Sequence, residues 1–390
     1  MMRRSCQILR ALALGICWVG HATADTQNTG LQPYQMVRSL QLVQDRIASG
    51  DHASLPMQKK LLELIDLRLR TAGEEEFKDS RNVQALMIYA MSGGNPSTVA
   101  TSLARPELPD ADRDAGAGIL AYLVGDVNQA RAALDSIDPT KYPDEISAFL
   151  SLIKGSVLAS EEYDAAISHL DRARLLGPGT LIEEAALRRT VSLAVAKRDA
   201  TRFLAVSEQY ARRFLRSPYA AQFAEAFIAG VVELRSELDL NGLDQTIAWM
   251  TGEQARTIYL RLARRAAIDG DKQLLAYASK RASEYPPSEA ESDPRAELYS
   301  SISTVTSDAV TETLNRLEGL DGSGLTQKDR ALLKAAKTVA NEVVAPVKPT
   351  ALPAFVQPEA EEAPEDTSGI VETTRARLQA IDKLLEETAQ

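Results

Sequence analysis

Histidine, cysteine and closely spaced carboxylates are the residues whose chemistry could give this chain a catalytic or metal-binding site. The 390 residues include only three histidines and two cysteines. Cys6 and Cys17 lie near the N-terminus, whereas His52 falls at an expected turn and His169 inside an expected helix. Nucleophilic and acid–base catalysis need such groups within hydrogen-bond reach of one another. The sequence therefore predicts no catalytic, cofactor-binding or metal site, and a protein that is not an enzyme.

Alternating carboxylates at Asp110, Asp112 and Asp114 resemble the start of a calcium-binding loop. Such a loop needs glycine at its sixth position and a bidentate glutamate at its twelfth. Those positions hold Ala115 and Ala121. We interpret the three aspartates as the acidic first turn of a helix, which the helix dipole favours.

Two other motif matches lack the context that their chemistry requires. The segment Gly116–Ala121 fits the G-x-G-x-x-A pattern of nucleotide-binding loops, but a polar acidic segment precedes it instead of the required strand. Its small residues predict close helix packing. Glu291-Ser292 matches the catalytic pair of lytic transglycosylases, yet it lies in a Pro- and Ser-rich segment that offers no desolvated cleft to raise the pKa of a proton donor.

The first 24 residues have the layout of a cleavable signal peptide. Arg3 and Arg4 precede a short apolar run, Ile8–Gly20, and Ala22-Thr23-Ala24 forms an A-x-A cleavage site before Asp25. The run is shorter than the roughly 20 apolar residues that span a bilayer. We expect Sec export to the periplasm with cleavage between Ala24 and Asp25. Lipoprotein attachment through Cys17 and twin-arginine export are the less favoured alternatives.

Composition limits the partners of the exported chain. Both cysteines would be removed with the signal peptide, so no disulfide could form in the oxidising compartment. The full-length net charge is -10, and the first 24 residues hold three arginines and no acidic residue, so cleavage makes the chain more acidic still. Nucleic-acid binding needs a basic face. We expect protein partners, no nucleic acid, no small-molecule substrate, no cofactor and no transmembrane anchor in the mature chain.

The elements that would position any site are predicted to be helices. Aromatic residues make up 5% of the chain, and β-branched runs typical of strands are absent. The first expected helix starts at Pro33 and is closed by Gly50. A second is expected from about Pro56 to Arg70, and a third near Val83–Ala90 ends at the glycine and proline residues of 92–96.

A repeat of two helices is indicated by three similar breaks, at Asp138-Pro139, Gly177-Pro178 and Ser217-Pro218, spaced by 39 and 40 residues. Such recurrence predicts an α-solenoid, a helical-hairpin array in which each unit packs against its neighbours. Ala166, Leu170, Ala173 and Pro178 fit the spacing of a degenerate tetratricopeptide-like (TPR-like) unit. The alternative is an irregular helical bundle.

Further helices are expected at Ile247–Met250, Ile258–Ile268, Leu274–Glu284 and Leu332–Val344, which completes an all-α body over residues 25–345. Residues 346–368 are rich in Pro and Glu and predict a disordered linker. Residues 369–390 predict an amphipathic helix with Leu378, Ile381 and Leu385 on one face. That helix either docks on the body or enters a groove of a partner.

A cluster of basic residues, Arg212, Arg213 and Arg216, is the other candidate partner-binding surface. Guanidinium groups pair with carboxylates of an acidic partner. The alternative is a solvated helix face, for which such clusters are common.

Several long segments resemble the MotC family of periplasmic motility proteins. They are Pro33–Met36, Gly50–His52, Met57-Gln58, Arg81–Val83, Ile88–Pro96, Ala173–Thr180, Glu183–Arg189, Tyr210–Leu215 and Ser217–Ala220. The resemblance extends from about Leu31 to Ala267.

The resemblance implies a periplasmic accessory of the flagellar motor that binds the periplasmic part of the stator protein MotB and is required for flagellar rotation. The resemblance assigns no catalytic residue to any position of this chain. A general periplasmic TPR-like adaptor for envelope or secretion machinery is the alternative from a different functional class.

Overall fold

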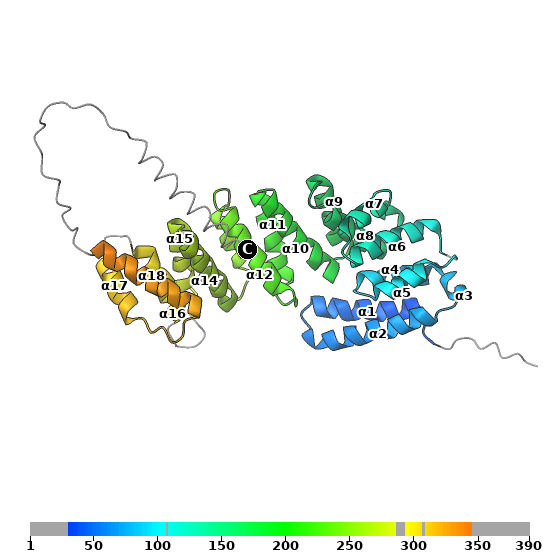
Figure 1. Ribbon diagram of the computed structural model, residues 1–390, viewed down its shortest axis with the longest axis horizontal. Helices are drawn as coiled ribbons and strands as arrows, with labels where there is room; N and C mark the ends of the chain where they lie inside the picture. Colours follow the sequence, from blue (N-terminus) through cyan, green and yellow to red (C-terminus); the bar gives the residue numbers. More distant parts are fainter. Residues whose placement is uncertain (1–29, 107, 286–292, 306–308, 345–390) are drawn as a thin grey trace, which may run out of the picture. The chain divides into compact units, whose positions relative to one another are not determined.

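A computed structural model describes residues 30–344 except 107, 286–292 and 306–308 (Figure 1). By its contacts the chain divides into one unit ending at Ala340 and a second starting at Asn341. The expected signal peptide with its Ala24–Asp25 junction, the linker over 346–368 and the helix over 369–390 with Leu378, Ile381 and Leu385 all lie outside the described residues.

The described residues form 18 α-helices and no strand, which confirms the all-α fold. Their bounds are α1 (Pro33–Ala48), α2 (Leu55–Thr71), α3 (Glu74–Phe77), α4 (Ser80–Met91), α5 (Pro96–Leu103), α6 (Asp110–Leu123), α7 (Val127–Leu134), α8 (Asp144–Val157), α9 (Tyr163–Leu176), α10 (Leu181–Ala196), α11 (Ala200–Arg213), α12 (Ala220–Glu233), α13 (Leu240–Ile247), α14 (Gly252–Asp269), α15 (Lys272–Ser283), α16 (Pro294–Thr304), α17 (Val310–Gly319) and α18 (Gln327–Val344). Over the ranges described, no helix is both long enough and apolar enough for a bilayer.

The expected breaks separate helix pairs. The pairs α6–α7, α8–α9 and α10–α11 each pack within themselves, and they end before Asp138-Pro139, Gly177-Pro178 and Ser217-Pro218 respectively (Figure 1). Proline cannot continue a helix, because it lacks the backbone N–H and its ring clashes with the preceding turn. The two-helix repeat predicted from the sequence is therefore confirmed.

The first helices of successive pairs form a continuous layer. Helix α4 contacts α6, and the series continues through α8, α10, α12, α14 and α16, each touching the next. The second helices, such as α7 and α9, pack on this layer. This is the helical-hairpin array of an α-solenoid, in which each pair buries its apolar face against its neighbours, and not an irregular bundle.

Small residues bring the paired helices close together. Ala166, Leu170 and Ala173 of α9 are fully buried, as their TPR-like spacing predicts. A Cβ atom on Gly155 of α8 would lie 2.7 Å from Leu170 Cγ, so only glycine fits at this crossing. Contact between α8 and α9 at this distance depends on glycine having no side chain.

Glycines also allow close contact in the preceding pair, α6 and α7. A Cβ atom on Gly118 of α6 would lie 2.5 Å from Leu134 Cγ of α7, and one on Gly116 would meet the side chain of Leu103 in α5. Both glycines are buried in the helix interior. The interpretation of the glycine motif as a packing feature is therefore confirmed.

One predicted helix position is wrong. Ile247–Met250 was expected to be helical, but α13 ends at Ile247. The Asp239 side chain accepts hydrogen bonds from the backbone N–H groups of Asn241 (3.0 Å) and Gly242 (3.1 Å), and so fixes the start of the helix seven residues earlier. Helices α16 and α17 were not predicted individually.

Candidate partner-binding groove

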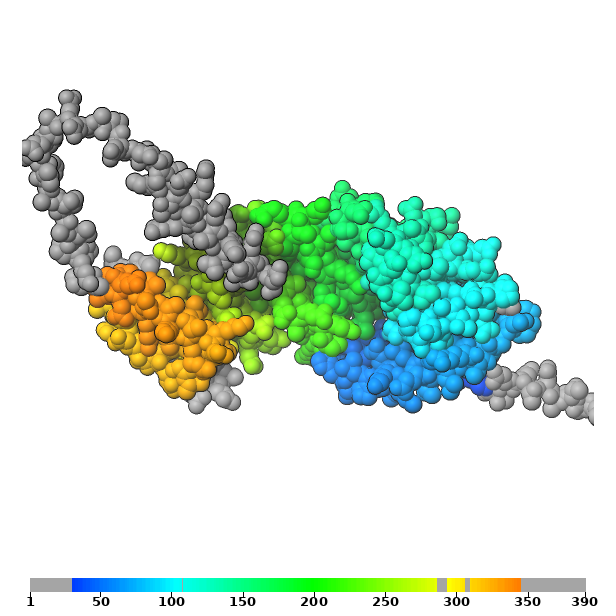
Figure 2. All heavy atoms as spheres, in the orientation of Figure 1, coloured from blue at the N-terminus to red at the C-terminus, as the bar shows by residue number. Residues whose placement is uncertain are grey.

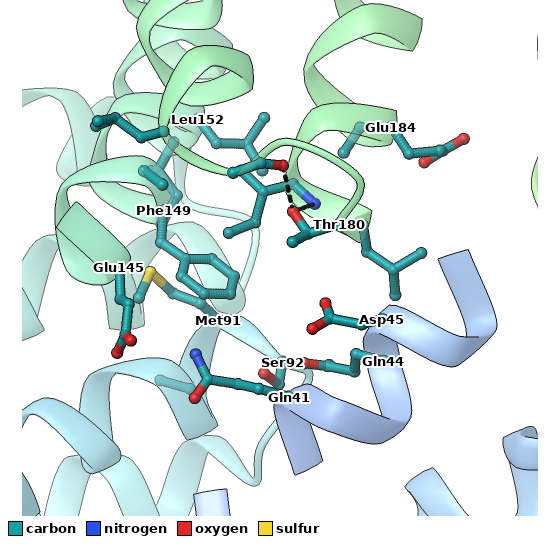
Figure 3. A pocket seen from close by; sticks show the side chains of 18 of the residues that line it. Gln41, Gln44, Asp45, Met91, Ser92, Glu145, Phe149, Leu152, Thr180 and Glu184 are labelled. Atoms are coloured by element: carbon teal, nitrogen blue, oxygen red, sulfur yellow. Dashed lines mark hydrogen bonds between the residues drawn. The ribbon is translucent and has the colours of Figure 1, made fainter. Parts of the chain in front are cut away.

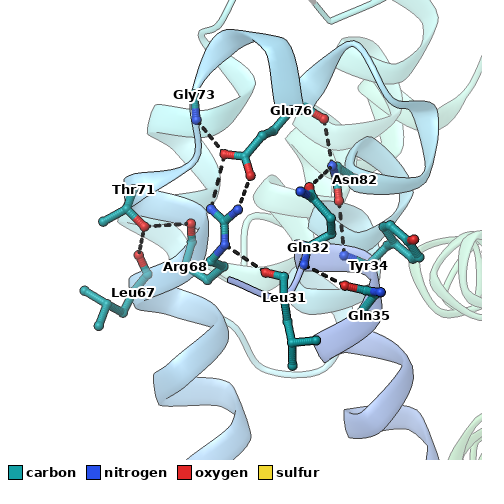
Figure 4. A network of polar contacts seen from close by, with 10 residues as sticks. All are labelled: Leu31, Gln32, Tyr34, Gln35, Leu67, Arg68, Thr71, Gly73, Glu76 and Asn82. Atoms are coloured by element: carbon teal, nitrogen blue, oxygen red, sulfur yellow. Dashed lines mark hydrogen bonds and ion pairs between the residues drawn. The ribbon is translucent and has the colours of Figure 1, made fainter. Parts of the chain in front are cut away.

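Helix α1 is held at its N-terminal end by a polar network (Figure 4). Arg68 of α2 donates to the carbonyl of Leu31 (2.9 Å) and pairs with Glu76, which also accepts from Gly73 N–H (2.9 Å). Partial burial opposes ionisation of Glu76, but these hydrogen bonds outweigh it and lower its pKa. The buried Asn82 of α4 accepts from the backbone N–H of Tyr34 (3.1 Å). The start of α1 is thereby fixed against α2 and α4.

The other end of α1 is held by residues far along the chain. Gly50 has φ +101°, and a Cβ atom there would lie 2.5 Å from Arg216 Cβ. The Nε2 atom of His52 lies 2.7 Å from the carbonyl oxygen of Arg216. Ala48 is buried in the same apolar cluster as Tyr210 and Phe214. Helix α1 therefore reaches from α4 to α10 and the turn after α11, and it passes the first helices of the pairs between them.

A groove of about 490 Å³ lies between α1 and these helices (Figure 3). This volume is in the range of about 300–1,000 Å³ that is typical of ligand pockets. Half-buried or exposed apolar side chains line it: Leu42 of α1, Met91 of α4, Leu123 of α6, Phe149 and Leu152 of α8, Leu176 of α9 and Leu181 of α10. We call this feature the α1 groove. In Figure 2 the surface of α1 and α2, in blue, lies directly against that of the cyan helices that follow.

The α1 groove carries an acidic side chain that is free of protein partners. Asp45 is exposed, and within the described part of the chain its carboxylate has no hydrogen bond or ion pair. It points into the groove beside Thr180 and Ser92 (Figure 3). Water reaches it, but the surrounding walls desolvate it in part and raise its pKa above the ordinary value of 3.8.

The basic residues of α10 at the groove already have partners. Arg188 pairs with Glu184 (3.1 Å) and donates to Gln222 (2.8 Å), and its guanidinium lies 5.0 Å from the ring centroid of Tyr219. Arg189 donates to the hydroxyl of Tyr122 (2.7 Å).

Two adjacent buried glutamates hold α10 to α11. Glu184 accepts from the hydroxyl of Tyr210 (2.7 Å), and Figure 3 shows it pointing away from the groove. Burial, and next the charge of Glu184, raise the pKa of Tyr210. Glu183 pairs with Arg213 (2.7 Å) and accepts from Gln209 (3.1 Å). Arg213, expected to bind a partner, therefore neutralises a buried carboxylate inside the protein.

The remaining arginines of the expected cluster lie apart from this pair. Arg212 is exposed, and its guanidinium lies 4.6 Å from the ring centroid of Trp249, which is half exposed. The indole N–H of Trp249 donates to Glu208 (3.1 Å). Arg216 contributes its backbone carbonyl to the contact with His52. Trp and Arg are common in protein–protein contacts, so Arg212 and Trp249 form a second candidate surface.

The residues first considered for chemistry do not come together. His52 contacts the Arg216 carbonyl, whereas His169 lies on α9, where burial and next the charges of Lys154 and Arg172 lower its pKa. Asp110 and Asp112 lie in the first turn of α6. Among the residues that the structure describes, no three His, Cys, Asp or Glu side chains are arranged to hold a metal ion.

Sequence reasoning missed the residues that form the groove. Leu42 and Asp45 lie on the face of α1 opposite its buried Leu40 and Ile47, where a solvated face is the simplest expectation. The one available signal was Leu42 itself, an apolar residue outside the apolar stripe. Trp249 is a similar case, a large apolar side chain that stays half exposed just after the buried Ile247 at the end of α13.

Comparison with known proteins gives one consistent result. The model of the family described as chemotaxis protein MotC matches residues 1–390. The chemotaxis protein MotC of Rhizobium meliloti (strain 1021) is 38% identical over 348 residues, which cover 89% of this chain and 80% of that protein. No solved structure matches the chain.

Proposed function

Because this chain belongs to the MotC family of chemotaxis proteins, we propose that it acts in flagellar motility by binding the periplasmic part of the stator protein MotB after export to the periplasm. The protein has no catalytic role in this proposal. Its contribution is a helical surface that recognises another protein, which is the usual use of an α-solenoid.

The observation that carries the proposal is the α1 groove. Segments on which the family resemblance rests supply its walls, among them Met91 and Ser92 from Ile88–Pro96, Gly177 and Thr180 from Ala173–Thr180, and Arg188 and Arg189 from Glu183–Arg189. Other such segments, Gly50–His52 and Tyr210–Leu215, lie where the C-terminal end of α1 is anchored. Residues from several of the segments that carry the family resemblance thus line one apolar concave site.

Co-purification and motility test the proposal together. The mature chain should bind the isolated periplasmic part of MotB, and a strain that lacks the chain should assemble flagella that do not rotate. Normal swimming by that strain rules out the motor function. Envelope or secretion defects with intact swimming would instead support the general periplasmic adaptor.

Export is a separate step of the proposal. The expected signal peptide ends at Ala24, so the protein purified from periplasm should begin at Asp25. N-terminal sequencing of that protein measures the cleavage site. Recovery of the uncleaved chain from the cytoplasm alone contradicts the periplasmic location.

Two surfaces other than the groove are proposed as additional partner contacts. They are the Arg212–Trp249 surface and the expected C-terminal helix with Leu378, Ile381 and Leu385, which lies outside the described residues. Binding by an Arg212→Ala variant and by a chain ending at Val344 measures each contribution.

A further inference from the structure

Asp45 differs from the buried carboxylates in the described part of the chain in having no partner side chain. The buried carboxylates Glu183, Glu184 and Asp329 each bind an arginine side chain 2.7–3.1 Å away. Asp45 points into an apolar groove without any such partner among the described residues (Figure 3). A partly desolvated charge without a partner costs stability.

We propose that the α1 groove binds a segment of its protein partner in which a lysine or arginine stands next to an apolar side chain, with the basic group paired to Asp45. The inference rests on the proposed function, in which that partner is the periplasmic part of MotB. The apolar side chain occupies the space between Leu42, Phe149 and Leu152.

At Asp45 the groove favours a basic group over an acidic one, because no arginine or lysine of the described residues pairs with this carboxylate. Asp45 and Glu145 line it, and neither has an ion pair within the described ranges. Glu184 and Arg188 neutralise each other, and Arg189 is held by Tyr122. Among these residues Arg189 has no ion pair either, and exposed Arg38, near the start of α1, is a second cation that lines this groove without one. It lies two helical turns before Asp45, so it does not replace a basic group beside Asp45.

The size of the groove and the net charge of the chain argue against two other occupants, a long helix and a second copy of this chain. A helix with its side chains is about 10–12 Å across and rises 1.5 Å per residue, so the volume of 490 Å³ matches about three or four helical residues. A second copy of this chain brings the same net charge of -10, and this repulsion opposes self-association. A short basic and apolar segment of a different protein fits both limits.

Calorimetric binding of the full mature chain to the periplasmic part of MotB tests the inference. Asp45→Asn should weaken binding about tenfold or more, because it removes a charge-assisted hydrogen bond. Asp45→Lys should weaken it further through repulsion. Leu42→Glu, which places a charge among the apolar walls, should also weaken binding. The matched control is Glu225→Gln on α12, an exposed carboxylate without an ion pair outside the groove, which should bind as the wild type.

A second measurement separates binding from folding. Asp45→Asn should melt at the same temperature as the wild type or higher, since it removes a partly desolvated charge. Weaker binding at an unchanged or raised Tm supports the inference, and weaker binding with a lowered Tm contradicts it. Wild-type binding by Asp45→Asn, Asp45→Lys and Leu42→Glu overturns the inference while the proposed function stands. Absence of binding by the wild-type chain overturns the proposed function and this assignment with it.

Discussion

At the scale of single residues, buried and partly buried carboxylates join neighbouring helices. Asp329 of α18 accepts from Arg264 of α14 (2.8 Å) and from the hydroxyl of Tyr299 of α16 (2.9 Å). Asp244 of α13 binds Tyr259 of α14 (2.7 Å) and Arg281 of α15. Such groups are stable in a core only when their hydrogen bonds are complete. Each one therefore fixes how its helices are placed.

Replacing Asp329 by Asn should lower the free energy of unfolding by about 1.5–3 kcal/mol at pH 7, because charged hydrogen bonds are lost. Burial opposes ionisation, but bonds from Thr326, Arg264 and Tyr299 prevail and lower the pKa of Asp329 below 3.8. The native protein thus favours the ionised form. Its stabilisation is complete above pH 3.8 and is lost as the pH falls through the native pKa.

Denaturant unfolding at several pH values measures this effect. The difference between wild type and Asp329→Asn should shrink below about pH 4. Asp110→Asn is the control, because the Asp110 side chain is 94% exposed and its ion pair is long (3.5 Å). A difference that stays constant down to about pH 3 contradicts the assignment.

Adjacent arginines of α11 should differ in their effect on stability. Arg213→Ala leaves the buried Glu183 with only its bonds to Gln209 and Gly179, and should cost about 1–3 kcal/mol. Arg212→Ala exposes no buried charge and should stay within about 0.5 kcal/mol of wild type. Thermal melting of the two variants measures the difference. Equal melting temperatures argue against a structural role for Arg213.

At the scale of helices, glycine allows the close contacts on which the array depends. Gly118 and Gly155 lie where the two helices of a pair cross, and their partners are the leucines Leu134 and Leu170. Gly50 does the same for α1, where the chain must turn with a positive φ against Arg216. Helix α1 is consequently anchored at both ends, with the groove beneath its middle.

Gly50→Ala should destabilise the anchored end of α1. The new Cβ atom meets Arg216 Cβ at 2.5 Å and the Arg216 carbonyl oxygen at 3.2 Å, and alanine disfavours a φ of +101°. Gly93→Ala is a matched control, since Gly93 has φ +89° and nothing within 4 Å of its Cβ position. We expect Gly93→Ala to lower the free energy of unfolding by about 1–2 kcal/mol, which is the cost of the left-handed backbone conformation without any steric clash. Gly50→Ala should lower it by more, because the clash is added.

Denaturant unfolding gives both values, and partner binding gives a second comparison. Gly50→Ala should weaken binding because it displaces α1 from the groove, whereas Gly93→Ala should not. Equal unfolding free energies and equal binding of the two variants would falsify the anchoring role of the Gly50–Arg216 contact.

At the scale of the whole molecule, the array is built from contacts between neighbouring pairs, and α1 is the exception. It touches both α4 and α10, which lie far apart in sequence. Most solenoid contacts are local, so such a bridge couples units that would otherwise be independent. The α1 groove exists only because of this long-range contact.

Removal of residues 345–390 should leave the melting temperature within about 1 °C of the full chain, because the loss of about 1 kcal/mol shifts Tm by only about 1–2 °C in a chain of this size. The apolar clusters of the described residues are formed by helices of the array packing on one another, and we expect these contacts to supply its stability. Calorimetry of a chain ending at Val344 measures this. A clear fall in Tm means that the expected helix with Leu378, Ile381 and Leu385 docks on the body.

The same truncated chain tests where the partner binds. Retained binding to the periplasmic part of MotB assigns recognition to the helical array, which carries the α1 groove and the Arg212–Trp249 surface, and not to the expected C-terminal helix. Lost binding at an unchanged Tm assigns it to the tail.

The sequence by itself determined the helical class and the repeat. Breaks such as Gly177-Pro178 act locally. Proline restricts its own backbone conformation and glycine widens the conformations that its backbone can adopt, and neither effect depends on distant residues. The repeat, the packing role of Gly118 and the family membership accordingly follow from the order of the residues alone. The position of α13 was predicted wrongly, because the hydrogen bonds of the Asp239 cap decide where this helix begins.

Only the tertiary structure decided which exposed residues share a site. Arg212 and Arg213 are equivalent in the sequence, yet one lies over Trp249 and the other neutralises Glu183. In the sequence Asp45 and Leu42 belong to an ordinary polar helix face, and the contact of α1 with α10 places them along the groove. The physical reason is that burial and pairing of a charge depend on helices distant in sequence. Where a helix begins and ends depends instead on adjacent residues.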